Sequence, residues 1–177
     1  MDLIGERVRL RALLPEDATS MVGALADPEV TAGVGLWASR PYGLDDARGW
    51  IDQKRQDEVL WAIEDRADGA FAGVTGLDKI DRRSRNCWWG IWIGPTSRWG
   101  RGLGTEACRL ATGYAFRHLG LEKVCLSVYE TNPRARRVYE RCGYELEGSL
   151  PRDSLVAGRL VTCHVMAVFR DHPMYAR

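Results

Sequence analysis

Three glycines at alternate positions, Gly100, Gly102 and Gly104, are the sequence feature that most restricts the fold. They separate a strand-like segment at 87–93 from a helical pattern at 103–119. Glycine permits a tight turn with positive φ, and the first N–H groups of a helix have no intrahelical acceptor. The segment therefore predicts a strand, a loop that binds a diphosphate through its main chain, and a helix whose dipole adds to the attraction.

Two other phosphate-binding loops fit this spacing badly. A P-loop requires Gly-Lys-Ser/Thr, which is absent, and a dinucleotide fingerprint beginning at Gly100 and Gly102 would place its third small residue at Thr105. A turn that needs glycine only for its backbone conformation remains an alternative. With 25 Lys and Arg against 24 Asp and Glu, the net charge is +1, which argues against nucleic acid or an anionic membrane as a partner.

The composition predicts one folded domain. The chain has 177 residues, 45% of them hydrophobic, and at about 100 to 200 residues per domain we expect a single domain over 1–177. No apolar run reaches ~18 residues and the N-terminus lacks a signal-peptide core, so we expect a cytoplasmic protein. The five cysteines stand singly, without a Cys-x-x-Cys pair or a histidine at ligand spacing. Neither a disulfide framework nor a metal site is predicted.

Hydrophobic periodicity and turn signals predict the element order β-α-α-β-β-β-α-β-α-β-β. We expect strands at 7–14, 60–64, 70–80, 87–93, 123–129, 144–150 and 159–169, and helices at 15–26, 44–56, 103–119 and 133–142. The last helix has Asn132 as its N-cap and Gly143 as its C-cap. Its spacing places Tyr139 on the interior side, where a tyrosine is more often core than catalyst.

The glycine loop and the segment 132–144 together resemble the GNAT superfamily of acetyl-CoA-dependent N-acetyltransferases, in particular its RimJ and RimL branch. The resemblance implies an α/β (α+β) GNAT fold with a mixed, mostly antiparallel sheet of about seven strands, flanked by about four helices and splayed at the cofactor site. Further stretches share it: Leu10-Arg11 with Pro15-Glu16-Asp17-Ala18, Asp27-Pro28-Glu29-Val30, Trp61-Ala62-Ile63, Gly73-Val74-Thr75-Gly76-Leu77 and Gly90-Ile91-Trp92-Ile93-Gly94-Pro95.

The resemblance also implies roles for individual residues. Trp92 and Ile93 end the strand that receives the pantetheine and acetyl groups, Asn132 meets the pantetheine amide, and Tyr139 protonates the departing thiolate. Arg136, with Arg137, is a candidate phosphate ligand on the helix beside the cofactor. Arg82, Arg83 and Arg85 are expected to form a solvated turn, with an acidic partner or the 3′-phosphate of CoA as the alternative. The loop residues that would hold the CoA pyrophosphate are Trp99, Gly100, Arg101, Gly102, Leu103, Gly104 and Thr105.

Two positions depart from the family pattern. Trp99 stands where the pattern Gln/Arg-x-x-Gly-x-Gly/Ala begins, which removes one side-chain donor. Trp88 stands where relatives often carry an acidic residue that serves as general base. Glu130 is our candidate for that base, with Asp78 or a chain of waters as alternatives.

The absence of an acidic residue at position 88 affects which acceptor amine we expect. An α-amine is about 14% neutral at pH 7 and a lysine amine about 0.04%, so a site without a base favours amines of low pKa. We expect an amine-bearing small molecule or a protein N-terminus to enter between the segments 33–42 and 152–158. The aromatic rings of Trp37, Tyr42 and Trp50 are candidates to stack on this acceptor or enclose it. A CoA-binding sensor or scaffold without turnover is the alternative function, and a homodimer is left open.

Overall fold

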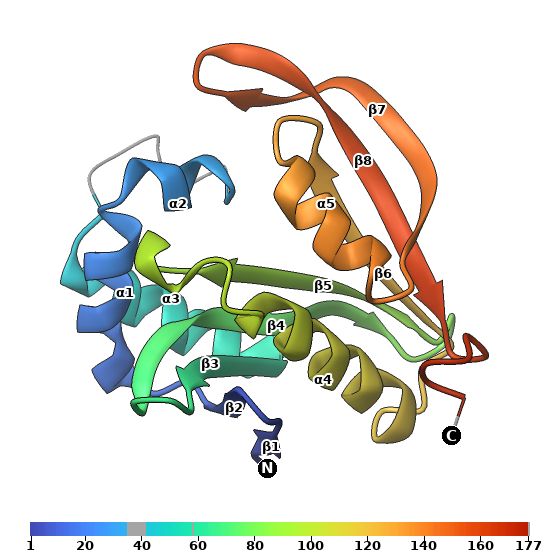
Figure 1. Cartoon of the computed structure of the whole chain (residues 1–177), viewed down its shortest axis with the longest axis horizontal. Helices are drawn as coiled ribbons and strands as arrows, with labels where there is room; N and C mark the ends of the chain where they lie inside the picture. Colours follow the sequence, from blue (N-terminus) through green and yellow to red (C-terminus); the bar gives the residue numbers. More distant parts are fainter. Residues whose placement is uncertain (35–41, 58, 177) are drawn as a thin grey trace.

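The computed structural model describes residues 1–34, 42–57 and 59–176, which form one eight-stranded sheet and five α-helices (Figure 1). The sheet order is β1-β2-β3-β4-β5-β6-β8-β7, and all neighbours are antiparallel except β5 and β6. The strands are β1 (Leu3–Ile4), β2 (Val8–Ala12), β3 (Val59–Asp65), β4 (Ala70–Asp81), β5 (Asn86–Ile93), β6 (Lys123–Tyr129), β7 (Glu145–Val156) and β8 (Arg159–Phe169). The helices are α1 (Ala18–Leu25), α2 (Pro28–Ala32), α3 (Leu44–Asp57), α4 (Leu103–Arg117) and α5 (Pro133–Glu140).

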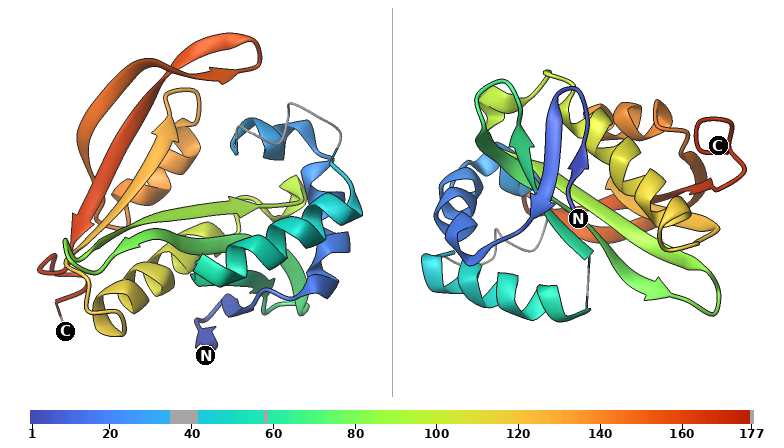
Figure 2. Two further views of the ribbon diagram at one scale, coloured as in Figure 1. Left: turned by 180° about the vertical axis from the view of Figure 1, so that it is seen from behind. Right: turned by 90° about the horizontal axis from the view of Figure 1, so that it is seen from below.

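The helices cover both faces of the sheet. The views from front and back show α4 and α5 on one face and α3 on the other (Figures 1 and 2). Because side chains alternate along each strand, each face of the sheet has its own hydrophobic core. Trp89 and Ile63 pack with Ala107 of α4 on the first face, whereas Ala62 packs with Ile51 of α3 on the second.

The structure confirms the predicted order of elements and differs in three places. β1 and α2 were not expected, because two and five residues are too few to show a period. β7 was predicted to end at Leu150 but continues to Val156, through Pro151. A proline is tolerated there because β7 is the edge strand, where the missing N–H leaves no ladder partner unsatisfied.

The sheet is splayed between β5 and β6, as the family resemblance implied. The two strands pair only from Asn86 to Trp88 of β5, and from there they diverge (Figure 1). In the neighbouring strand pair, the register between β3 and β4 shifts next to the pair Ile63–Gly73, and Gly73 has a φ of +145°. A Cβ on Gly73 would lie 3.0 Å from the Cα of Ile93 and closer still to the Trp92 carbonyl. The glycine thus allows β4 to follow the end of β5 closely.

Glu106 in the first turn of α4 fastens the helix to the N-terminal strands. Its carboxylate accepts hydrogen bonds from the backbone N–H groups of Glu6, Arg7 and Val8 at 2.9, 2.7 and 2.7 Å. These contacts join residues about 100 positions apart and set the start of α4 against the β1–β2 turn.

Replacement of Glu106 by alanine would leave three N–H groups without their charged acceptor. We expect Glu106→Ala to lower the free energy of unfolding by about 2 to 3 kcal/mol, measured by urea denaturation. Glu147→Ala is the matched control, because Glu147 makes one ion pair with Lys123 near the surface and should contribute less than about 1 kcal/mol. Equal losses in both variants would show that Glu106 does not fasten α4.

Candidate active site

The glycine loop opens a main-chain cradle at the N-terminus of α4. Gly100 and Gly102 have φ values of +76° and +81°, and Gly102 is the N-cap residue with no side-chain cap. The N–H groups of the first turn, at Leu103, Gly104 and Thr105, have no acceptor inside the helix. A Cβ on Gly104 would meet only Ile93 Cγ1, at 3.8 Å, so protein packing does not require glycine there. The open space suits an anionic ligand that approaches the backbone closely.

Side chains of the loop support its shape. The indole N–H of Trp99 donates to the Ile93 carbonyl at 2.8 Å and so ties the loop to the end of β5. The Arg134 guanidinium of α5 stacks 3.3 Å from the centre of the Trp99 ring. The tryptophan that departs from the family pattern therefore connects β5, the loop and α5.

Arg101 is also part of this support. Its guanidinium pairs with Asp65 at 2.8 Å, and Arg98 pairs with the same carboxylate at 3.0 Å. The Asp65 side chain is only 3% exposed, so the two cations neutralise a buried charge at the end of β3.

The end of β5 presents its two predicted residues to opposite faces. Trp92 pairs with Val74 and Ile93 with Gly73 in the antiparallel register. Ile93 packs partly buried on the α4 side, and the Trp92 ring contacts Phe71 on the α1 and α3 side, with ring centres 5.8 Å apart. The two side chains therefore lie on opposite faces of the sheet at the end of β5, the strand that borders the opening.

Tyr139 of α5 lies beside β5, where the strands begin to separate. Its ring is 8% exposed and meets Trp89 edge-on, with centres 5.5 Å apart and planes at 90°. Burial raises the pKa of the Tyr139 phenol above its ordinary value, and the neighbouring Cys108 and Cys142 add to the effect. The hydroxyl therefore stays protonated across the physiological range and serves as a donor.

Asn132 caps α5, as its sequence position predicted. Its Oδ1 accepts from the Ala135 N–H at 3.1 Å. Its Nδ2 faces α2, because a Cβ on Gly33 would lie 3.5 Å from it. The amide donor therefore lies near Gly33, the C-cap residue of α2. Trp37, one of the expected acceptor contacts, lies outside the described part of the chain.

Two other predicted residues already hold partners elsewhere. Arg136 forms an ion pair with Glu140 one turn along α5, at 2.9 Å. Glu130 is exposed, and its Oε1 accepts from the Thr162 N–H at 2.7 Å, which joins the end of β6 to β8. Their roles as phosphate ligand and base remain predictions. Arg85, the alternative phosphate ligand, pairs with Glu122 at 2.6 Å at the end of β5 away from the glycine loop.

Asp78 lies next to the position where the sequence lacks an acid. It is the cross-strand partner of Trp88, so both side chains lie on the same face of the sheet. The carboxyl group is half-buried, and burial raises its pKa, opposed by the positive charges of Lys79 and Lys54. The Lys79 Nζ lies 5.2 Å from the centre of the Trp88 ring. Only the pairing register brings Asp78 to this place, since it lies ten positions from Trp88 in the sequence.

Among the residues that the structure describes, no group of three or more His, Cys, Asp or Glu side chains could hold a metal ion. None of the described helices has the length and apolar character needed to cross a membrane.

A main-chain anion cradle at a helix N-terminus, set beside two parallel strands that separate, defines an acyltransferase of the coenzyme A-dependent class. Comparison with known families agrees: residues 7–145 match the acetyltransferase (GNAT) domain. The chain belongs to the GNAT acetyltransferases, and it is an acetyl-CoA-dependent N-acetyltransferase.

Similar proteins include two kinds of acetyltransferase. YdaF of Bacillus subtilis (strain 168), provisionally named a ribosomal N-acetyltransferase, is 32% identical over 157 residues, covering 86% of this chain and 85% of YdaF. The spermidine N(1)-acetyltransferase of Escherichia coli (strain K12) is 32% identical over 135 residues, or 76% of this chain and 72% of that enzyme. The crystal structure of Vibrio cholerae spermidine N-acetyltransferase with CoA and spermine aligns with a TM-score of 0.84 at 25% identity, covering 98% of this chain and 100% of that one.

Proposed function

We propose that the enzyme transfers the acetyl group of acetyl-CoA to the primary amine of a small molecule or a protein N-terminus, by direct attack of the amine on the thioester. The observation that carries this proposal is the opening between β5 and β6. The anion cradle lies at one end of this opening, and the buried Tyr139 hydroxyl donor lies beside the point where the two strands begin to separate. The relatives that act on spermidine favour a small amine, and the likeness to YdaF favours a protein amine.

Each part of the site has a task in this reaction. Bound acetyl-CoA would supply the thioester carbonyl that the amine attacks. The N–H groups of Leu103, Gly104 and Thr105 would hold the pyrophosphate with the helix dipole. The Asn132 Nδ2 is available to a pantetheine carbonyl, and the Tyr139 hydroxyl would give its proton to the sulfur of the leaving thiolate.

The amine must lose a proton, and two carboxylates are candidates to accept it. Glu130, the base that the sequence favoured, accepts a hydrogen bond from the Thr162 N–H with one carboxylate oxygen and is exposed to solvent. Asp78 is half-buried beside Trp88, at the place where the strands begin to separate. We therefore place Asp78 before Glu130 as the general base of the proposed reaction.

The continuous sheet from β1 to β7 and β8 supports one domain over residues 1–177. The likeness to YdaF, provisionally named for a ribosomal acetyltransferase, is compatible with a RimJ/RimL-like branch. A cytoplasmic location and a homodimer remain predictions that await fractionation and sedimentation measurements.

Release of free CoA thiol distinguishes the enzyme from the sensor or scaffold alternative. We expect thiol release from acetyl-CoA with at least one member of a panel of polyamines and N-terminal peptides, with mass spectrometry locating one acetyl group on the amine. A protein that binds acetyl-CoA but releases no thiol with any amine would be a binding module instead.

Gly104 offers a direct test of the main-chain cradle. We expect Gly104→Val to weaken CoA binding by more than about tenfold, because the new side chain occupies the ligand's approach to the N–H groups. The protein has room for the valine, since the nearest atom to its Cβ is Ile93 Cγ1 at 3.8 Å, so the melting temperature should not fall. Isothermal titration calorimetry with CoA measures the change.

Two loop variants serve as comparisons. Gly102→Val should also weaken binding, but valine is strained at φ +81° and the protein should lose stability as well. Arg101→Ala should cost little CoA affinity, since its guanidinium is occupied by Asp65. Equal losses of affinity in all three variants would assign the binding to charge and not to the backbone.

A further inference from the structure

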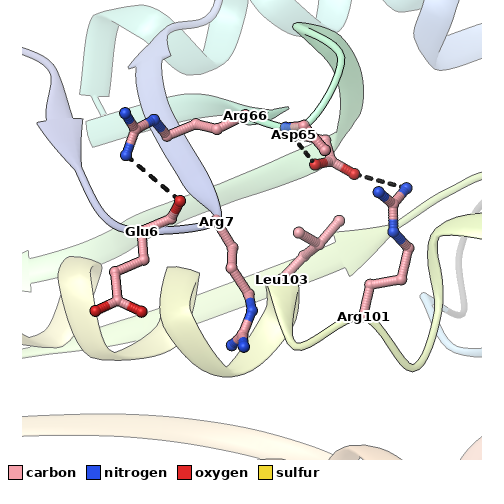
Figure 3. A pocket seen from close by; sticks show the side chains of 7 residues that line it. Glu6, Arg7, Asp65, Arg66, Arg101 and Leu103 are labelled. Carbon is pink, nitrogen blue, oxygen red and sulfur yellow. Dashed lines mark hydrogen bonds and ion pairs between the residues drawn. The ribbon is translucent and has the colours of Figure 1, made fainter.

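A cavity of about 400 Å³ lies beside the glycine loop, between the loop and the turns that join β1 to β2 and β3 to β4. Figure 3 shows that the long side chains of its walls come from all three segments. The lining residues are Glu6, Arg7, Asp65, Arg66, Ala67, Arg101 and Leu103. Three guanidinium groups thus surround a space that falls in the usual size range of ligand pockets, about 300 to 1,000 Å³.

The partners of these groups leave one guanidinium without a hydrogen bond or an ion pair. Arg101 pairs with Asp65, which Arg98 also neutralises, and Arg66 donates to the Gly5 carbonyl. The Arg7 guanidinium makes no hydrogen bond or ion pair with any residue that the structure describes. Glu6, the other carboxylate of the lining, does not pair with it (Figure 3). Arg7 is therefore the group free to bind a ligand.

Arg7 also lies against the anion cradle. A Cβ on Gly102, the N-cap of α4, would be 3.3 Å from Arg7 Nη1. The Glu106 carboxylate fixes the backbone of Arg7 at this position through a 2.7 Å hydrogen bond. A free cation next to the positive end of a helix is unfavourable by itself, and an anion bound between them would relieve the repulsion.

We propose that Arg7 and this cavity bind the 3′-phosphate monoester of coenzyme A, while the N–H groups of the adjacent loop bind its pyrophosphate. The inference rests on the proposed function, because it assumes that the loop holds CoA. A phosphate monoester carries close to two negative charges and matches the planar donors of a guanidinium in a bidentate pair. The site would then discriminate CoA from dephospho-CoA, and Arg7 would be the residue responsible.

Calorimetric binding of CoA and dephospho-CoA to three forms of the protein tests the proposal. We expect the unmodified protein to prefer CoA by about tenfold or more, in line with one charge-assisted bidentate contact. Arg7→Gln should lose that preference while its affinity for dephospho-CoA stays unchanged. Arg9→Gln is the matched control, because Arg9 is exposed, pairs with Asp2 at 2.6 Å and does not line the cavity. It should bind both ligands as the unmodified protein does.

Competition identifies the source of the phosphate. Adenosine 3′,5′-bisphosphate should compete with CoA in the unmodified protein and lose potency in Arg7→Gln. If inorganic phosphate competes as well as the bisphosphate, the cavity takes free phosphate and the assignment to CoA is wrong.

Several results would overturn the inference. A CoA preference that survives in Arg7→Gln, or an equal loss for both ligands, would remove Arg7 from the 3′-phosphate. An unmodified protein that binds the two ligands equally would defeat this inference alone, with the proposed function intact. A protein that binds neither ligand would defeat both.

Discussion

Tyr139→Phe should lower kcat by about 10- to 1000-fold with little change in KM, because the lost proton matters only when the thiolate departs. The leaving group is a thiol, and since a cysteine thiol has a pKa near 8.5, a thiolate departs readily, which limits how much an acid can contribute. Steady-state rates of thiol release at saturating acetyl-CoA measure the effect.

Tyr144 provides a control of the same residue type in the same core. Its hydroxyl shares a 2.8 Å hydrogen bond with Thr112 Oγ1, and its ring lies 6.2 Å from that of Trp89. Tyr144→Phe should therefore cost about 1 kcal/mol of stability with kcat unchanged. The Tyr139 hydroxyl has no hydrogen-bond partner among the described residues, so Tyr139→Phe should leave stability unchanged. An unchanged kcat in Tyr139→Phe would mean that the Tyr139 hydroxyl is not the general acid and that the side chain serves only in packing.

Local signals made most of the fold predictable from sequence. The α4 start follows from the glycine loop, and the α5 start from Asn132, because each is decided within a few residues. Side-chain alternation along β5 places Trp88 and Trp92 on the face opposite Trp89. Trp89 is buried at 4% exposure in the α4 and α5 core, and the other two rings are half-buried on the opposite face.

The partners of the polar side chains were not predictable, because they come from distant parts of the chain. Nothing near Glu106 in sequence indicates that it binds the β1–β2 turn, and nothing near Arg101 indicates Asp65. The same holds for Glu130, whose carboxylate accepts a hydrogen bond from the Thr162 N–H of β8, 32 positions further along the chain. Sequence periodicity places a side chain on a face, but only the strand register decides which side chain it meets.

The register between β4 and β5 places Asp78 beside Trp88, and a general base at this position changes the expected pH dependence of kcat/KM. Without a base, kcat/KM would rise with a slope of one up to the pKa of the acceptor, because only the neutral amine would react. With Asp78 as base, the ammonium form binds and gives up its proton in the site. The ascending limb then reports the pKa of Asp78, which burial raises, and stays at the same pH for every acceptor.

Replacing this carboxylate should separate its catalytic role from its effect on stability. Burial raises the Asp78 pKa in the folded protein, so the ionised form is disfavoured by folding, and above the unfolded pKa the charge reduces stability. Asp78→Asn removes that charge and should not lower the free energy of unfolding at neutral pH. The rate should fall by about 100-fold or more at neutral pH, within the usual range for a lost general base.

The pH profiles of Asp78→Asn and the unmodified enzyme, each with two acceptors that differ by about two pKa units, decide the matter. An N-terminal peptide and a simple alkyl amine form such a pair. In Asp78→Asn the ascending limb should move to the pKa of each acceptor, and in the unmodified enzyme it should not.

Glu130→Gln is the control, and it should keep the profile of the unmodified enzyme because the Glu130 carboxylate already accepts a hydrogen bond from the Thr162 N–H. The opposite pattern would assign the base to Glu130. A limb that follows the acceptor even in the unmodified enzyme would mean that neither carboxylate takes the proton and that the enzyme selects amines already neutral in solution.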